Sequence, residues 1–120
     1  MELDELADCL EKLGNRTRLA IFRLLVRAGP EGLPVGELQS RLDIPASTLS
    51  HHILFLVTAQ LIRQQREGRV LRCTPNYERM HAIVAALTAE CCAGLPARSE
   101  AAPARPSRKQ RPAPARAKRS

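Results

Sequence analysis

The sequence has little that would place it in or across a membrane. Its apolar runs, such as residues 53–57, are far too short to span a bilayer. Its first ten residues, MELDELADCL, are acidic and lack the basic segment and apolar core of a secretory signal. These absences argue against a membrane or secreted protein and predict a cytoplasmic one.

The chain has four cysteines in 120 residues: Cys9, Cys73, Cys91 and Cys92. Thiols stay reduced in the cytoplasm, so structural disulfides are not expected. The four thiols are expected to be packed in the core, redox-active or bound to a metal ion.

The net charge of +7 is confined to the end of the chain. Residues 1–95 carry eleven Lys or Arg and eleven Asp or Glu, whereas residues 96–120 carry eight Lys or Arg against Glu100 alone. The second segment is rich in Ala, Pro and Arg and cannot bury enough apolar surface to fold. We therefore predict a domain at 1–95 and a disordered basic tail at 96–120, which either adds phosphate contacts or solubilises the protein.

Apolar residues at helical spacing predict a first helix that ends at Gly14 and a second that begins after Asn15. The residues of the second helix expected to face inward are Leu19, Phe22, Leu25 and Val26. Residues 33–42 suggest an extended piece and a short helix, and another helix opens after Pro45.

Two short strand-like runs follow on either side of Glu67 and Gly68, which predicts a β-hairpin with a tight turn there. Thr74 and Pro75 predict the start of a last helix, with Gly94 as its stop. The apolar stripe of that helix is expected to hold Met80, Ile83, Val84, Leu87 and Cys91. The order helix, helix, helix, helix, hairpin, helix predicts a mainly α winged helix-turn-helix fold.

Short polar side chains open the second helix of the predicted helix-turn-helix: Ser47, Thr48, Ser50 and His51. The N-terminal end of such a helix meets base edges in the major groove of double-stranded DNA. Arg66 and Arg69, at the hairpin tip, are placed to contact phosphates. We expect these six residues to bind DNA, and we expect His52 to pack in the core.

The segments LGNRTRLAIFRLL, SHHILFLVTAQLI and QREGRVLRC together resemble the ArsR/SmtB family of winged-helix repressors over residues 6–94. The resemblance implies a homodimer built on the first and last helices and bound to an inverted-repeat operator. It also implies that an ion or small ligand releases the DNA. After His52, the second helix of the predicted helix-turn-helix reads ILFLVTAQ, where members of the family often carry polar or basic residues. Leu54 and Val57 are therefore expected to be exposed or packed in an unusual way.

Two common inducer sites of the family are not reproduced in this sequence. The short helix before the turn has no cysteine, and Glu78, His81 and Glu90 do not have the spacing of a four-ligand zinc site. The ECC pair before a glycine, however, resembles the site of an arsenic-responsive subgroup. That resemblance implies trivalent arsenic or antimony as inducer at Cys91 and Cys92. In that subgroup a further cysteine follows the pair, whereas this chain has none after Cys92. Cys73 is then the candidate third ligand, and Cys9 of a second subunit is another.

The chemistry of adjacent thiols narrows their role. Consecutive Cα atoms lie about 3.8 Å apart, closer than a relaxed disulfide requires. A helix C-terminus disfavours a bare thiolate, whereas a soft cation stabilises one. Redox or persulfide sensing by the same fold, and a thiol-based metal carrier, stay open as alternatives. No nucleophile–base constellation in the sequence supports an enzyme, and no obligatory cofactor is expected.

Overall fold

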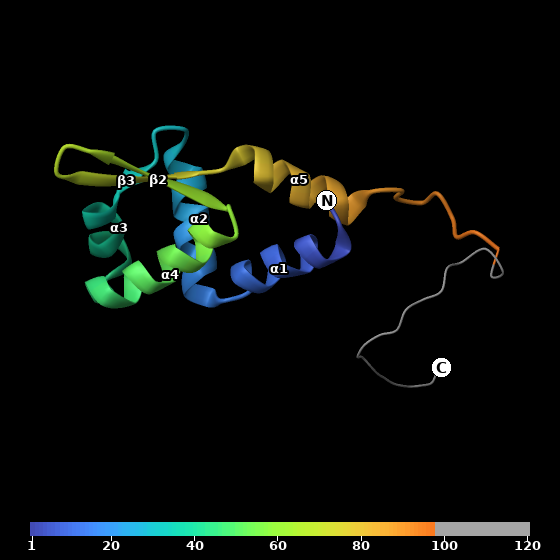
Figure 1. Cartoon of the computed structure of the whole chain (residues 1–120), viewed down its shortest axis with the longest axis horizontal. Helices are drawn as coiled ribbons and strands as arrows, with labels where there is room; N and C mark the ends of the chain where they lie inside the picture. Colours follow the sequence, from blue (N-terminus) through green and yellow to red (C-terminus); the bar gives the residue numbers. More distant parts are fainter. Residues whose placement is uncertain (98–120) are drawn as a thin grey trace. The chain divides into compact units, whose positions relative to one another are not determined.

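The computed structural model of the protein describes residues 1–97 (Figure 1). The predicted basic tail falls almost wholly on residues 98–120, outside the described part of the chain. The chain divides into two units, Met1–Ala89 and the segment that begins at Glu90. The first unit holds every helix and strand described here.

The elements of the first unit follow the predicted order. They are α1 (Leu3–Leu13), α2 (Arg16–Ala28), β1 (Leu33–Pro34), α3 (Val35–Leu42), α4 (Ala46–Thr58), β2 (Ile62–Glu67), β3 (Val70–Pro75) and α5 (Tyr77–Thr88). This arrangement confirms the winged helix-turn-helix fold. Within residues 1–97, no helix has the length and apolar character needed to cross a membrane.

The sheet is antiparallel with strand order β1-β3-β2. Gly68 and Arg69 connect β2 to β3, and Gly68 has a φ of +65°. Only glycine adopts that backbone region without strain, which explains the tight turn. On the other side of β3, Leu33 of β1 pairs with Cys73. The predicted extended piece is therefore the third strand, and it ties the helix-turn-helix to the hairpin.

The core lies where the helices meet the base of the sheet. Its buried side chains include Cys9 of α1, Ile21, Phe22 and Leu25 of α2, Leu38 of α3, Leu49, Ile53 and Leu56 of α4, and Ile83 of α5. The inward position predicted for Leu19 is wrong, because that side chain is 41% exposed. At about 100° per residue, Ile21, Phe22 and Leu25 share one side of α2, and Leu19 falls outside it.

Side-chain caps fix two helix starts. The Asn15 side chain accepts hydrogen bonds from the N–H groups of Thr17 and Arg18, as predicted. The predicted start at Thr74 and Pro75 is wrong, because both residues pair with β2. Asn76 caps α5 instead: its side chain accepts from the Arg79 N–H at 3.3 Å and donates to the Gln60 carbonyl at 2.8 Å.

The last helix is shorter than predicted. It ends at Thr88, and Ala89 turns to an extended backbone with φ −58° and ψ 136°. Glu90 and Cys92 then have positive φ values of 61° and 64°. The predicted apolar stripe therefore stops before Cys91, which is exposed. Cys91 is therefore not packed in the core of its own chain, whereas packing against a second copy stays a prediction.

Candidate functional site

The helix-turn-helix consists of α3, α4 and the three residues between them. Asp43 ends α3 in the left-handed region with a φ of +53°, and Pro45 precedes the first residue of α4. The inward face of α4 consists of Leu49, Ile53 and Leu56, all buried in the core. Because that face anchors α4 along its length, its opposite face points to solvent.

The outward face of α4 begins with small polar groups. Ser47, Thr48, Ser50 and His51 are all exposed, so the structure leaves every predicted base-contacting residue accessible. Ser47, Ser50 and His51 stand at i, i+3 and i+4, which places them on one side of the helix. Leu54, at i+7, continues that side and is 62% exposed.

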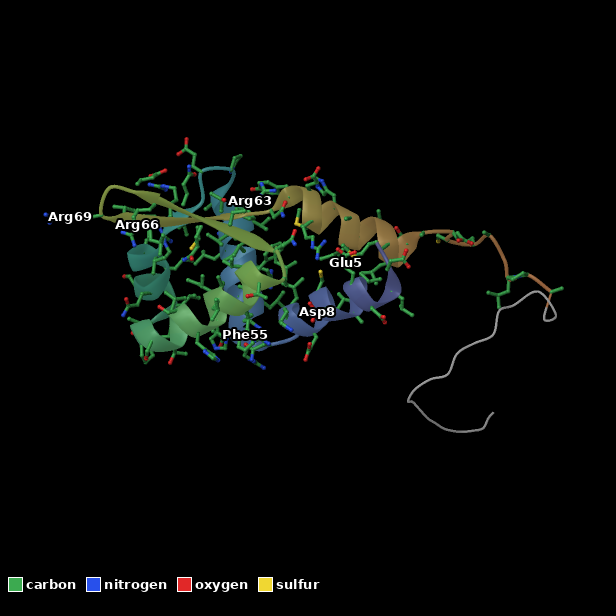
Figure 2. The ribbon with its side chains drawn as sticks, viewed as in Figure 1. Glu5, Asp8, Phe55, Arg63, Arg66 and Arg69 are labelled. Atoms are coloured by element: carbon green, nitrogen blue, oxygen red, sulfur yellow. The ribbon has the colours of Figure 1, made fainter. Side chains whose placement is uncertain are left out.

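The β2–β3 hairpin extends from the core beside the helix-turn-helix, and arginines follow it to its tip (Figure 2). Arg66 and Arg69, both predicted, are exposed, and so is Arg63 nearer the core. The Arg72 guanidinium is engaged by Glu67 at 3.0 Å. Arg63 was not among the predicted DNA-binding residues. Its place next to buried Ile62 on a strand indicates an outward side chain.

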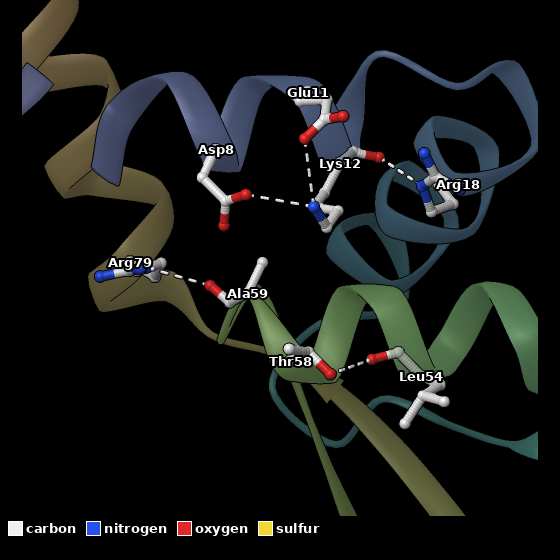
Figure 3. Close-up of polar contacts among 8 residues, drawn as sticks. All are labelled: Asp8, Glu11, Lys12, Arg18, Leu54, Thr58, Ala59 and Arg79. Carbon is white, nitrogen blue, oxygen red and sulfur yellow. Dashed lines mark hydrogen bonds and ion pairs between the residues drawn. The ribbon is translucent and has the colours of Figure 1, made fainter. Parts of the chain in front are cut away.

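A cluster of aromatic and basic side chains supports α4 on the side away from the hairpin. The Phe55 ring lies edge-on to the His51 ring at 4.8 Å between centroids. The Arg18 guanidinium carbon lies 4.9 Å from the Phe55 centroid, and Lys12 Nζ lies 5.9 Å from it. Arg18 Nε also donates to the Lys12 carbonyl at 2.6 Å (Figure 3). Cation–π and stacking contacts thus tie α4 to the α1–α2 junction.

His52 is half-buried within this cluster, where its Nδ1 lies 3.4 Å from Nη1 of Arg18. Burial lowers the pKa of His52 below its ordinary value of 6.5, and the nearby charges of Arg18 and His51 lower it further. The folded protein therefore favours the neutral imidazole.

The depressed pKa of His52 predicts that the protein loses stability in acid. Below pH 6.5 the unfolded chain takes up the His52 proton before the folded chain does, so the free energy of unfolding falls as the pH drops. Urea unfolding between about pH 7.5 and about pH 5.5 measures this loss. A His52→Gln variant is expected to lose part of the pH dependence. The matched control, His81→Gln at an exposed position of α5, is expected to keep it, and equal slopes in the two variants would contradict the assignment.

Arg79 connects α5 to the rest of the first unit. Its Nε donates to the Ala59 carbonyl at 3.2 Å, just after the end of α4 (Figure 3). Its Nη1 forms an ion pair with Glu5 of α1. One side chain therefore joins the first helix, the last helix and the C-terminal end of α4.

The four thiols fall into two classes. Cys91 and Cys92 are exposed, and their Sγ atoms lie 3.5 Å apart. Cys9 and Cys73 are fully buried in the first unit. Cys73 Sγ accepts a hydrogen bond from Gln64 Nε2 at 3.8 Å, and burial raises the pKa of its thiol. Among residues 1–97, no three His, Cys, Asp or Glu side chains form a group suited to a metal ion.

Comparisons with known proteins agree with this geometry. A family model described as a helix-turn-helix domain matches residues 13–65. The crystal structure of the ArsR family transcriptional regulator RHA00566 is 31% identical, with a TM-score of 0.63, over 73% of this chain and 88% of that one. The chain belongs to the ArsR family of transcriptional regulators.

Two further solved structures match over similar lengths. HlyU from Vibrio cholerae is 29% identical over 77% of this chain and 99% of its own, with a TM-score of 0.59. Mb0332 from Mycobacterium bovis, described as a homodimeric winged helix-turn-helix DNA-binding domain, is 25% identical over 73% of this chain and 82% of its own, also with a TM-score of 0.59. No curated protein matches the chain. Helix α4 therefore lies where the recognition helix of a helix-turn-helix lies, and the β2–β3 hairpin lies where the wing lies.

Proposed function

We propose that this ArsR-family chain is a dimeric repressor that binds an inverted-repeat operator and leaves it when a thiophilic inducer binds. The observation that carries the DNA-binding part is the exposed polar side of α4 beside an arginine-lined hairpin. Ser47, Ser50 and His51 supply the short donors and acceptors suited to base edges in the major groove. The hairpin supplies cations for the adjacent phosphates.

The hairpin arginines set the salt dependence of this binding. Replacing Arg66 and Arg69 by alanine removes two phosphate contacts per protomer, so the slope of log affinity against log salt should become shallower by about two per protomer. Fluorescence anisotropy with an operator duplex between roughly 50 and 200 mM salt measures the slope. Arg23→Ala, an exposed cation on α2, is the matched control and should leave the slope unchanged. An unchanged slope in the Arg66→Ala, Arg69→Ala protein would remove the hairpin from the interface.

A second copy of the chain fits the exposed apolar surface of α1 and α5. Leu3 of α1 is 77% exposed, and Val84 and Leu87 of α5 are 55% and 57% exposed. Between the two helices lies a hollow of about 550 Å³ lined by Met1, Leu3, Leu6, Ala82, Ala85, Ala86 and Ala89. Small side chains at this place permit close helix packing across a two-fold axis. The homodimer described for Mb0332 supports the same assembly here.

The inducer site of the proposal consists of Cys91 and Cys92. Both thiols are accessible, and a Sγ separation of 3.5 Å allows one soft ion to bond to both sulfurs. Trivalent arsenic and antimony are thiophilic acceptors of this kind. With two thiolates, a methylated trivalent arsenical, which has fewer open positions, fits better than arsenite.

Cys73 is a weaker candidate for the third ligand than the sequence suggested. A ligand thiol must lose its proton, and burial raises the pKa of Cys73. Its sulfur is also fully buried and engaged by Gln64. Cys9 is equally buried. Cys91 and Cys92 therefore form a two-thiolate site. Cys73 could add a third sulfur only after a conformational change that exposes it.

Inducer binding just after α5 would act on the dimer helices. Arg79 joins α5 to Glu5 of α1 and to the carbonyl that follows α4, so a shift of α5 reaches the recognition helix through one side chain. A coupling free energy of about 1–3 kcal/mol between the two sites is typical of such regulators. Operator release on titration with methylarsenite or arsenite tests this part of the proposal.

A further inference from the structure

The apolar end of the outward face of α4 has no role in the polar interface described so far. Leu54 lies one turn beyond Ser50 on the face that carries Ser47 and His51, and it is 62% exposed. Thr58, the next outward side chain, donates its hydroxyl to the Leu54 carbonyl at 2.8 Å (Figure 3). Because that hydroxyl is turned back to its own helix, the group offered outward here is the Leu54 isobutyl group.

Leu54 also borders a hollow between α4 and the wing. The hollow has a volume of about 280 Å³ and is lined by Val35, Ser50, Ile53, Leu54, Gln64 and Leu71. Four of these side chains are apolar, two are polar and uncharged, and none is charged. By contrast, the hollow on the opposite face of the hairpin is lined by Glu31, Glu67 and Arg72 among others. An uncharged, mostly apolar lining suits an apolar ligand group and does not suit a phosphate.

The major groove presents one apolar group, the C5-methyl of thymine. The geometry points to Leu54 as a specificity residue that reads a thymine methyl in each operator half-site, with the hollow between α4 and the wing receiving the methyl. Ser50 lies on the rim of the same hollow, where a hydroxyl can pair with the neighbouring polar edge of the base pair. This inference rests on the proposed DNA-binding function and adds the kind of base that α4 recognises.

The inference also accounts for an exposed apolar side chain at position 54 of α4. A charged or amide side chain at position 54 would hydrogen-bond to any suitable base edge. Leucine forms no such hydrogen bond and instead makes a favourable apolar contact with a methyl group. Leu54 would then distinguish thymine from cytosine and uracil, which lack that methyl group.

Exchange of thymine for uracil in the duplex tests the inference directly. The full chain first selects duplexes from a random pool, and each thymine of the selected site is then replaced singly by deoxyuridine. At one position in each half-site, the exchange is expected to weaken binding of the unsubstituted protein about fourfold, the effect of withdrawing one methyl group from an apolar contact. Leu54→Ala removes this contact from both half-sites of the dimer, so it is expected to bind the thymine duplex about sixteenfold more weakly and to be insensitive to uracil at that position.

Val70→Ala is the matched control, because Val70 is an exposed aliphatic residue of the wing that does not line the hollow. It is expected to keep full sensitivity to uracil. The inference is overturned if the unsubstituted protein tolerates uracil at every position, or if Leu54→Ala remains as sensitive as the unsubstituted protein. If the full chain selects no sequence at all, the proposed DNA-binding function fails before this question arises, so the two failures are distinguishable.

Discussion

Replacing Cys91 and Cys92 together by serine is expected to abolish operator release by methylarsenite while leaving the affinity for DNA in its absence unchanged. Both side chains are exposed and lie outside the helix-turn-helix, so serine costs little stability. Serine hydroxyls cannot replace soft thiolates as ligands of trivalent arsenic. The unsubstituted protein should lose about 5- to 150-fold in operator affinity on binding inducer, and the variant should lose none.

The measurement is a titration of methylarsenite and of arsenite into the reduced protein bound to a labelled operator duplex. Cys9→Ala and Cys73→Ala are the controls, because each removes a thiol that is fully buried. Both controls are expected to release DNA as the unsubstituted protein does. Release by the double serine variant would place the inducer elsewhere, and loss of release in Cys73→Ala with its fold intact would make Cys73 the third ligand.

Gly32→Ala is expected to cause the largest loss of stability of any alanine substitution at a glycine of the first unit. Gly32 has a φ of +63°, and a Cβ built there would lie 1.8 Å from the backbone carbonyl oxygen of Cys73. The obstacle is the main chain of β3, so relief requires β1 to move away from β3, where Leu33 pairs with Cys73. Left-handed strain and overpacking together cost about 2–5 kcal/mol.

Gly68→Ala separates the two parts of this cost. Gly68 has a φ of +65°, almost the same as Gly32, but nothing lies within 4 Å of a Cβ built there. The Gly68→Ala variant should lose only the free energy that left-handed backbone strain costs, about 1–2 kcal/mol. Urea unfolding with unchanged m-values measures both. Equal losses in the free energy of unfolding of the two variants would show that the contact with β3 contributes nothing to the cost.

Local patterns in the sequence predicted most of the fold. Asn15 and Gly14 mark a helix start and a helix stop through groups within a few residues, and the structure confirms both. The hairpin was visible because Glu67 and Gly68 interrupt two strand-like runs. The prediction of a helix start at Thr74 and Pro75 was wrong, because both residues pair with β2 despite a local sequence pattern typical of a helix start.

Contacts between distant residues could not be predicted. The cluster of Lys12, Arg18 and Phe55 joins three helices, and no spacing in the sequence indicates that these side chains meet. The same holds for Arg79, whose partners Glu5 and Ala59 come from different parts of the chain. The end of α5 was missed for another reason. The apolar spacing continues to Cys91, although the backbone leaves the helix at Ala89.

The DNA sequences that the full chain selects from a random duplex pool test the central claim most directly. Two recognition helices related by a two-fold axis require an inverted repeat with half-sites about 10–10.5 base pairs apart, or a multiple of that distance. We predict that sequencing the bound fraction gives such a repeat, that each complex holds two protomers, and that a scrambled duplex does not compete at the same concentration. A bound fraction with no shared sequence, or a single half-site bound by one protomer, would contradict the account.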